Sequence, residues 1–275
     1  TTADMTEITD PASLSTTVLM DVNKTVTANY LLQYLFTFNQ TGLDNSAIGT
    51  VVTVDGSAKT YGNLPFSKWV GMGAPVTYNY EAMVSSSNVE KRFRLNNVTG
   101  SASPIIVTGP ITVTGNYVTQ YYLTVNTDSA DVLALNPLAV SGQGWYDSGA
   151  TATVDAVQVI DKVVGQSRYD FRSWTGATQT GTGNQATVVM DKAKTVTANY
   201  ALQYQVTFSQ TGLDASATGT VVTVDGLTKT YTDLPFTKWV DNGSSVSYSY
   251  ETNVLSSDLG KQFRLDSVTG LNSPI

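Results

Sequence analysis

The stretch from Thr112 to Val125 reads TVTGNYVTQYYLTV, and it joins the end of one repeat to the start of the next. Its apolar and polar residues alternate before and after the pattern NYxxQY, with the period of a β-strand. The same pattern recurs at Asn29–Tyr34 and at Asn199–Tyr204. No spacer of the kind found in flexible linkers follows it. We therefore expect strand register to continue through Thr25–Phe38, Thr112–Val125 and Thr195–Phe208, so that the joints between repeats are stiff.

Internal repeats define the modules of the chain. Residues 26–105 align without a gap to residues 196–275, and roughly two thirds of these positions are identical. A more distant match aligns Trp145–Gly176 with Trp239–Gly270. The repeats predict a segment 1–30 that ends in an orphan closing strand, followed by module 1 (31–117), module 2 (118–200) and module 3 (201–275). Module 3 stops at the equivalent of Ile105, so we expect it to lack its closing strand.

Strand signals dominate each module. Val76, Tyr78 and Tyr80 alternate with polar residues, which is typical of a strand with one buried face. The sequence VVTVDG, at 51–56 and again at 221–226, ends in the Asp-Gly pair that favours a tight hairpin. The single weak helix candidate is Val157–Val164. The sequence predicts an all-β fold of small β-sandwich or β-grasp-like modules in tandem, joined by continuous strands.

The segment Tyr121–Tyr200 resembles an internalin-type B-repeat of the Listeria–Bacteroides repeat family. It opens with YYLTV, continues through Asp147-x-Gly149 and FRSWTG at 171–176, and closes with TVTANY at 195–200. The other modules depart from this pattern, since Val98 and Val268 replace Trp174. The resemblance implies β modules of prokaryotic surface proteins that act as spacers, stalks or adhesive arrays. It implies no common catalytic site.

Composition excludes several classes of function. The 275 residues contain no cysteine and no histidine, which rules out disulfides, zinc fingers, haem ligation and His- or Cys-based catalysis. The net charge is −7, whereas nucleic-acid binding requires a basic face. No apolar run reaches the roughly 20 residues of a membrane helix. We therefore expect neither a nucleic-acid partner nor membrane insertion.

Acidic residues give no support for an enzyme or a metal site. A glycosidase needs two carboxylates across one cleft. Only four glutamates occur, and Glu81 and Glu251 are equivalent positions in separate modules. The aspartates Asp55, Asp147, Asp225 and Asp241 lie near glycines, where aspartate is an ordinary turn residue. The sequence predicts no catalytic residue, no metal site and no cofactor.

The tryptophans Trp69, Trp145 and Trp239 occupy one equivalent position in the three modules. An apolar strand face follows each of them, so we expect the three to lie in the cores, and truncation of Trp145 to cost about 3–5 kcal/mol. The alternative is an aromatic platform for sugars. Asn23, Asn39, Asn97 and Asn242 match the N-glycosylation pattern, although none of the four recurs in its equivalent position.

Closely similar repeats and a low charge suit an extended assembly. We expect a structural repeat protein of an extracellular fibre, stalk or surface layer. In one form of this hypothesis, the closing strand of one copy completes module 3 of the next, giving a head-to-tail homopolymer. That strand consists of Thr25, Val26, Thr27, Ala28, Asn29 and Tyr30. In the other form, the continuation of a longer repeat protein supplies the missing strand. The alternative function is an adhesin that binds a surface glycan or a protein.

Overall fold

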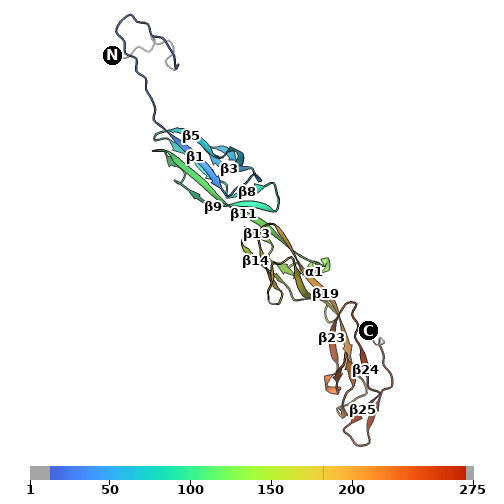
Figure 1. Cartoon of the computed structure of the whole chain (residues 1–275). Coiled ribbons are helices and arrows are strands. Elements are labelled where there is room, and N and C mark those ends of the chain that lie inside the picture. The colour runs from blue at the N-terminus through green and yellow to red at the C-terminus, as the bar shows by residue number, and fades with distance from the viewer. Residues whose placement is uncertain (1–12, 182, 271–275) are drawn as a thin grey trace.

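The computed structural model describes residues 13–181 and 183–270. Three β modules follow one another end to end, and the segment before module 1 extends away from it (Figure 1). Strands make up nearly all of the regular structure, so the predicted all-β fold is confirmed. The described residues form one α-helix, α1 (Ala130–Leu135). None of their helices is long and apolar enough to cross a membrane.

Two long strands connect the modules. β11 (Ile111–Thr127) begins in module 1, where it lies parallel to β1 (Gln33–Thr41) and antiparallel to β9 (Lys91–Thr99). Its second half lies in module 2, where it pairs with β13 (Gly144–Asp147) and, in parallel, with β19 (Lys194–Phe208). The closing strand of module 1 is therefore also the opening strand of module 2.

The long strand β19 repeats this arrangement at the next joint. Its first half pairs with β16 (Ser167–Thr175) in module 2, and its second half pairs with β23 (Phe236–Asp241) in module 3. One 11-stranded sheet thus runs through all three modules. The predicted continuity is confirmed for Thr112–Val125 and Thr195–Phe208, with a bulge next to β9 between Asn116 and Tyr117.

The predicted continuity is wrong for Thr25–Phe38, because the strand begins only at Gln33. Residues 25–32 are not part of any sheet, and all of them are exposed. The physical reason is the absence of partners. In the other two joints the equivalent residues hydrogen-bond to strands on both sides, whereas the described residues include no such strands beside this segment.

Smaller sheets cover the long sheet in each module. They comprise β3 (Thr50–Val54), β4 (Ser57–Thr60) and β7 (Tyr78–Tyr80) in module 1; β12 (Val140–Ser141), β14 (Thr151–Ala156), β17 (Gln179–Thr180) and β18 (Gln185–Val189) in module 2; and β21 (Val222–Val224), β22 (Leu227–Lys229) and β24 (Tyr248–Tyr250) in module 3. The remaining strands are β2 (Ala47–Ile48), β5 (Phe66–Gly71), β6 (Pro75–Val76), β8 (Met83–Ser86), β10 (Ile105–Ile106), β15 (Val159–Val163), β20 (Ala217–Thr218), β25 (Asn253–Ser256) and β26 (Gln262–Arg264).

The predicted Asp-Gly hairpins are confirmed. Asp55 and Gly56 connect β3 to β4 with φ angles of 43° and 78°, and Asp225 and Gly226 have φ angles of 45° and 79°. Two successive positive φ angles are the requirement of a type I′ turn, which glycine and aspartate meet at low cost. The expected helix at Val157–Val164 is wrong. This segment contains strand β15, which pairs with β16.

Each module has its own hydrophobic core, and the cores differ in completeness. Modules 1 and 2 contain large clusters of buried residues that include Phe36 and Phe93 in the first and Leu123 and Trp174 in the second. The cluster of module 3 has only Phe208, Val222, Val224 and Val246 as buried members. The smaller core of module 3 places one candidate site in that module.

Candidate assembly sites

A network of polar and aromatic side chains holds the joint between modules 1 and 2. The guanidinium of Arg92 stacks on the Trp145 ring at 4.3 Å, and its Nε donates to Oε1 of Gln120 at 2.8 Å. The amide of Gln120 donates in turn to Asp147 at 2.8 Å. Arg94 closes the network with an ion pair to Asp147 at 2.7 Å and holds the pKa of that carboxyl below its usual range. These contacts fix the two modules relative to each other.

The second joint repeats the network. Arg168 stacks on Trp239 at 4.3 Å and donates to Gln203 at 2.8 Å. Gln203 donates to Asp241 at 2.8 Å, and Arg172 also pairs with Asp241. Gln120 and Gln203 are the glutamines of the NYxxQY pattern, and both are only 7% exposed. The pattern thus marks the centre of a joint.

The predicted core position of Trp69, Trp145 and Trp239 is wrong. Trp69 is 65% exposed, and the other two are half-buried beneath arginines of the preceding module. Alternation along the strand explains this result, since the adjacent residues Val70, Tyr146 and Val240 pack against the cores. The tryptophans therefore lie on the opposite face.

A double-mutant cycle on Arg92→Ala and Trp145→Ala tests the first joint. We expect a coupling energy of about 0.5–1 kcal/mol, the usual strength of a partly exposed cation–π pair. Trp145→Ala alone should cost far less than a core truncation. Urea unfolding of the wild type, the two single variants and the double variant measures the cycle. Strict additivity would contradict the proposed stacking.

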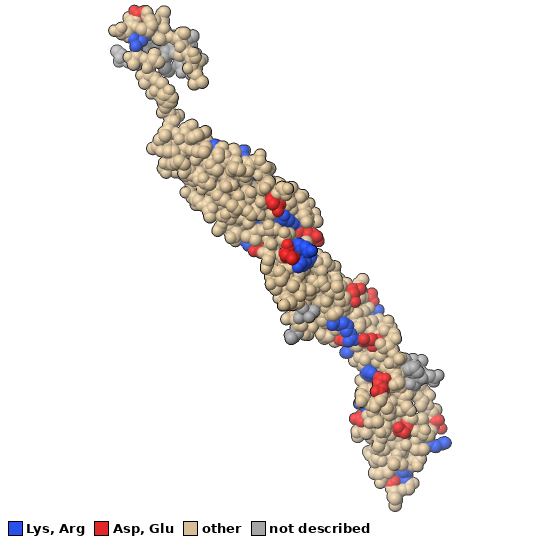
Figure 2. Space-filling view, in the orientation of Figure 1, with Lys and Arg blue, Asp and Glu red and all other residues tan. Residues whose placement is uncertain are grey.

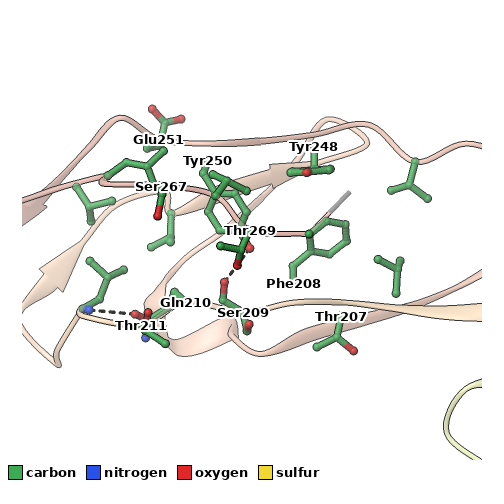
Figure 3. A pocket seen from close by; sticks show the side chains of 18 of the residues that line it. Thr207, Phe208, Ser209, Gln210, Thr211, Tyr248, Tyr250, Glu251, Ser267 and Thr269 are labelled. Atoms are coloured by element: carbon green, nitrogen blue, oxygen red, sulfur yellow. Dashed lines mark hydrogen bonds between the residues drawn. The ribbon is translucent and has the colours of Figure 1, made fainter. Parts of the chain in front are cut away.

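Module 3 has an open groove where a central strand lies in the other modules. In module 1, β11 fills the slot between β1 and β9. In module 3, the equivalent strands are β19 and β26, and no described strand lies between them. A cavity of about 1040 Å³ occupies this place. Figure 3 shows Phe208, Tyr248 and Tyr250 in the groove, with Tyr250 directed toward Ser209.

Equivalent side chains are less buried in the described part of module 3 than in module 1. Phe93 is fully buried in module 1, whereas the equivalent Phe263 is only half-buried. Val98 is half-buried, but the equivalent Val268 is exposed. Strand β9 has nine residues, whereas β26 has three. The walls of the groove thus present apolar surface that a strand covers in module 1.

The predicted assembly strand, Thr25–Tyr30, exposes side chains that are buried in the equivalent strands of modules 1 and 2. In modules 1 and 2 the closing strands bury Val113 and Tyr117, or Val196 and Tyr200. The equivalent Val26 and Tyr30 are 65% and 92% exposed. All six residues of the strand are exposed in this chain. Among the described residues, an exposed apolar strand face and a groove that no strand fills therefore occur together.

A tyrosine anchors each closing strand to the second sheet. The Tyr117 hydroxyl donates to the backbone oxygens of Val51 and Glu81, at 3.2 and 2.9 Å. The Tyr200 hydroxyl makes the equivalent bonds in module 2, and burial raises its pKa to about 12. Tyr117 and Tyr200 are the first tyrosines of their NYxxQY patterns, and Tyr30 is the equivalent residue of the third pattern.

The four glycosylation candidates occupy different surroundings. Asn23, Asn97 and Asn242 are exposed, and Asn39 is half-buried. The side-chain oxygens of Asn39 and Asn97 accept hydrogen bonds from Gln40 and Asn116. In the described part of the chain, no group of three or more acidic side chains is placed to hold a metal ion.

The chain matches no protein-family model, no curated protein and no solved structure. The sequence predicted Thr25–Tyr30 as an assembly strand, which stays a prediction, and it gave no prediction for Arg92 and Arg168. The sequence does contain a feature that indicates these arginines. Modules 1 and 2, which both precede a joint, carry an arginine at this equivalent position, whereas module 3 has Gln262 there.

Proposed function

We propose that this chain is a structural repeat protein of an extracellular fibre, stalk or surface layer, and that copies assemble head to tail by strand donation. The observation that carries the proposal is the combination of an open groove in module 3 with an exposed, strand-like segment before module 1. No described strand lies between β19 and β26 in module 3, and the exposed segment Thr25–Tyr30 has the sequence of a closing strand. An open sheet edge is a template for a strand from another chain.

The shared strands support a mechanical role. β11 has 17 residues, which span roughly 55 Å when extended, and it belongs to two modules at once. Bending at this joint would break backbone hydrogen bonds as well as the Arg94–Asp147 ion pair. We therefore expect the modules, which lie end to end in Figure 1, to behave as a stiff rod.

Register gives the geometry of the donated strand. Thr37 pairs with Thr112 in module 1, and Thr124 pairs with Thr195 in module 2, both in parallel. By the same register, Thr207 of one copy faces Thr25 of the next. The donated strand then runs in the direction of the rod and leads into module 1 of its own copy. Such a heterologous contact propagates into a fibre unless the rotation closes a ring.

Burial supplies the driving force for strand donation. Each of Val26 and Tyr30 gains about 1.5–3 kcal/mol when an exposed apolar side chain becomes fully buried. Val221 and Glu251 are the equivalents of the two residues that bind the Tyr117 hydroxyl, so their backbone oxygens can accept from Tyr30. The backbone ladder of the strand adds to these terms.

The joint between copies is weaker than the internal joints. Gly71 stands where modules 2 and 3 have Asp147 and Asp241, so no carboxylate is present to pair with Arg264 of the preceding copy. Gln262 stands in place of the stacking Arg92, which leaves Trp69 without a cation. We therefore expect assembly to depend on protein concentration.

The surface is consistent with an extended structural role. Charged residues make up 13% of the chain, about half of the usual share. In Figure 2 one group of charges lies at the junction of modules 1 and 2, others are spread over modules 2 and 3, and the visible face of module 1 above that junction carries few. Repeated, weakly charged surfaces favour lateral contacts between identical rods.

Deletion of residues 1–30 tests the proposal. The full chain should form fibres or multimers in sedimentation and negative-stain images, and the truncated chain should stay monomeric. A matched pair of variants gives the control. Val26→Asp should abolish assembly because this side chain enters the groove, and Thr25→Asp should not, since the equivalent Thr112 is exposed. Fibres from the truncated chain, or a monomeric full chain, would refute strand donation.

A further inference from the structure

The closing strands differ at one position that faces the second sheet. Module 1 has Gly115 there, whereas module 2 has Ala198 and the assembly strand has Ala28. The φ angle of Gly115 is not positive, so the backbone alone does not require glycine. The requirement is space. A Cβ atom at Gly115 would lie 2.4 Å from Cδ1 and 2.7 Å from Cε1 of Tyr80.

The residue of the second sheet that contacts this position of the closing strand differs in size between modules. Tyr80 is the residue of module 1 that occupies the space beside Gly115, and it is only 5% exposed. The equivalent residue in module 2 is Ala156, which is buried in the same core as Ala198. A large side chain in the second sheet thus accompanies glycine in the closing strand, and a small one accompanies alanine.

Module 3 has the large residue, Tyr250, and holds it in the position of Tyr80. The Tyr80 hydroxyl donates to the backbone oxygen of Asn39 at 2.6 Å, and the Tyr250 hydroxyl donates to that of Ser209 at 2.8 Å (Figure 3). The ring geometry also agrees. Tyr80 lies 5.9 Å from Tyr78 at 75°, and Tyr250 lies 6.1 Å from Tyr248 at 80°.

From this geometry we propose that Tyr250 makes the groove of module 3 select a strand with glycine at the position of Ala28, so that the strand of a second copy enters with a steric conflict. This inference rests on the proposed function and names the residue pair that sets the strength of the contact. The Ala28 methyl group meets the Tyr250 ring, and relief requires the ring to leave its bond to Ser209 or the strand to shift.

Three full-length variants test the selection. Ala28→Gly should tighten head-to-tail association about ten-fold or more, as expected when overpacking is removed. Tyr250→Ala should make Ala28 acceptable, as Ala156 does for Ala198, so Ala28→Gly should give no further gain in that background. Thr27→Gly is the control for backbone flexibility and should not tighten association. Sedimentation equilibrium gives the association constants.

A peptide-binding experiment tests the selection by Tyr250 independently of head-to-tail assembly. We would add a labelled peptide of residues 108–118 to the full chain, and the same peptide with Gly115→Ala, and measure fluorescence anisotropy. Tighter binding of the glycine peptide supports the selection even if the chain itself never polymerises, in which case only the head-to-tail proposal fails. Equal binding of both peptides, or binding of neither, overturns the selection by Tyr250.

Discussion

Replacing Trp174 with alanine should destabilise module 2 by about 3–5 kcal/mol, the usual cost of truncating a buried tryptophan. Trp174 is 7% exposed and contacts Phe171 at 5.8 Å between ring centroids. Its Nε1 donates to the backbone oxygen of Asn184 at 2.9 Å, and the truncation removes this hydrogen bond, although that oxygen still accepts from the backbone N–H of Ala156 at 3.1 Å. Chemical unfolding followed by fluorescence measures the change.

Trp69→Ala is the matched control for this prediction. Trp69 is 65% exposed, and surface substitutions of this kind usually change stability by less than about 0.5 kcal/mol. Equal losses for the two variants would mean that Trp174 does not fill the core of module 2.

Inserting Gly-Ser-Gly-Ser between Thr119 and Gln120 should convert the stiff joint into a hinge. The four residues interrupt β11 directly before Gln120, which pairs both with β9 of module 1 and with β13 of module 2. Gly/Ser segments behave as flexible coil, and an even number of residues keeps the side-chain faces of both halves. Small-angle scattering should show a shorter mean dimension and a distribution of shapes.

The same insertion between Asn88 and Val89 serves as the control, because this turn between β8 and β9 is exposed. That variant should scatter like the wild type. If the β11 insertion also left the scattering unchanged, the continuous strand would not be the source of stiffness.

Much of the fold could be predicted from the sequence because its strands alternate clearly. The period-2 pattern of Val76, Tyr78 and Tyr80 predicted the buried face of module 1, and the Asp-Gly pairs predicted both tight hairpins. The NYxxQY pattern predicted two continuous joints. It failed at Thr25–Phe38, since a strand also needs partners, and a pattern in one segment does not supply them.

The tryptophans could not be placed by alternation alone. Trp145 and Tyr146 are adjacent and both aromatic, so either could have faced the core. Contacts distant in the sequence decided the matter, because Arg92 lies over one face of Trp145. The sequence shows that Gly115 of module 1 corresponds to Ala198 of module 2. It also shows that Tyr80 corresponds to Ala156. Only the packing shows that the two positions meet.

The most direct test of strand donation uses the absence of cysteine from the chain. We would introduce Thr25→Cys and Thr207→Cys together, since the equivalent pairs Thr37–Thr112 and Thr124–Thr195 are strand neighbours. Thr37→Cys with Thr112→Cys is the control and should close a disulfide within one molecule. Under mild oxidation, the first variant should give a ladder of linked multimers on a non-reducing gel, and each single variant should give no species larger than a dimer. A first variant that remains monomeric, while the control closes its disulfide, would contradict head-to-tail strand donation.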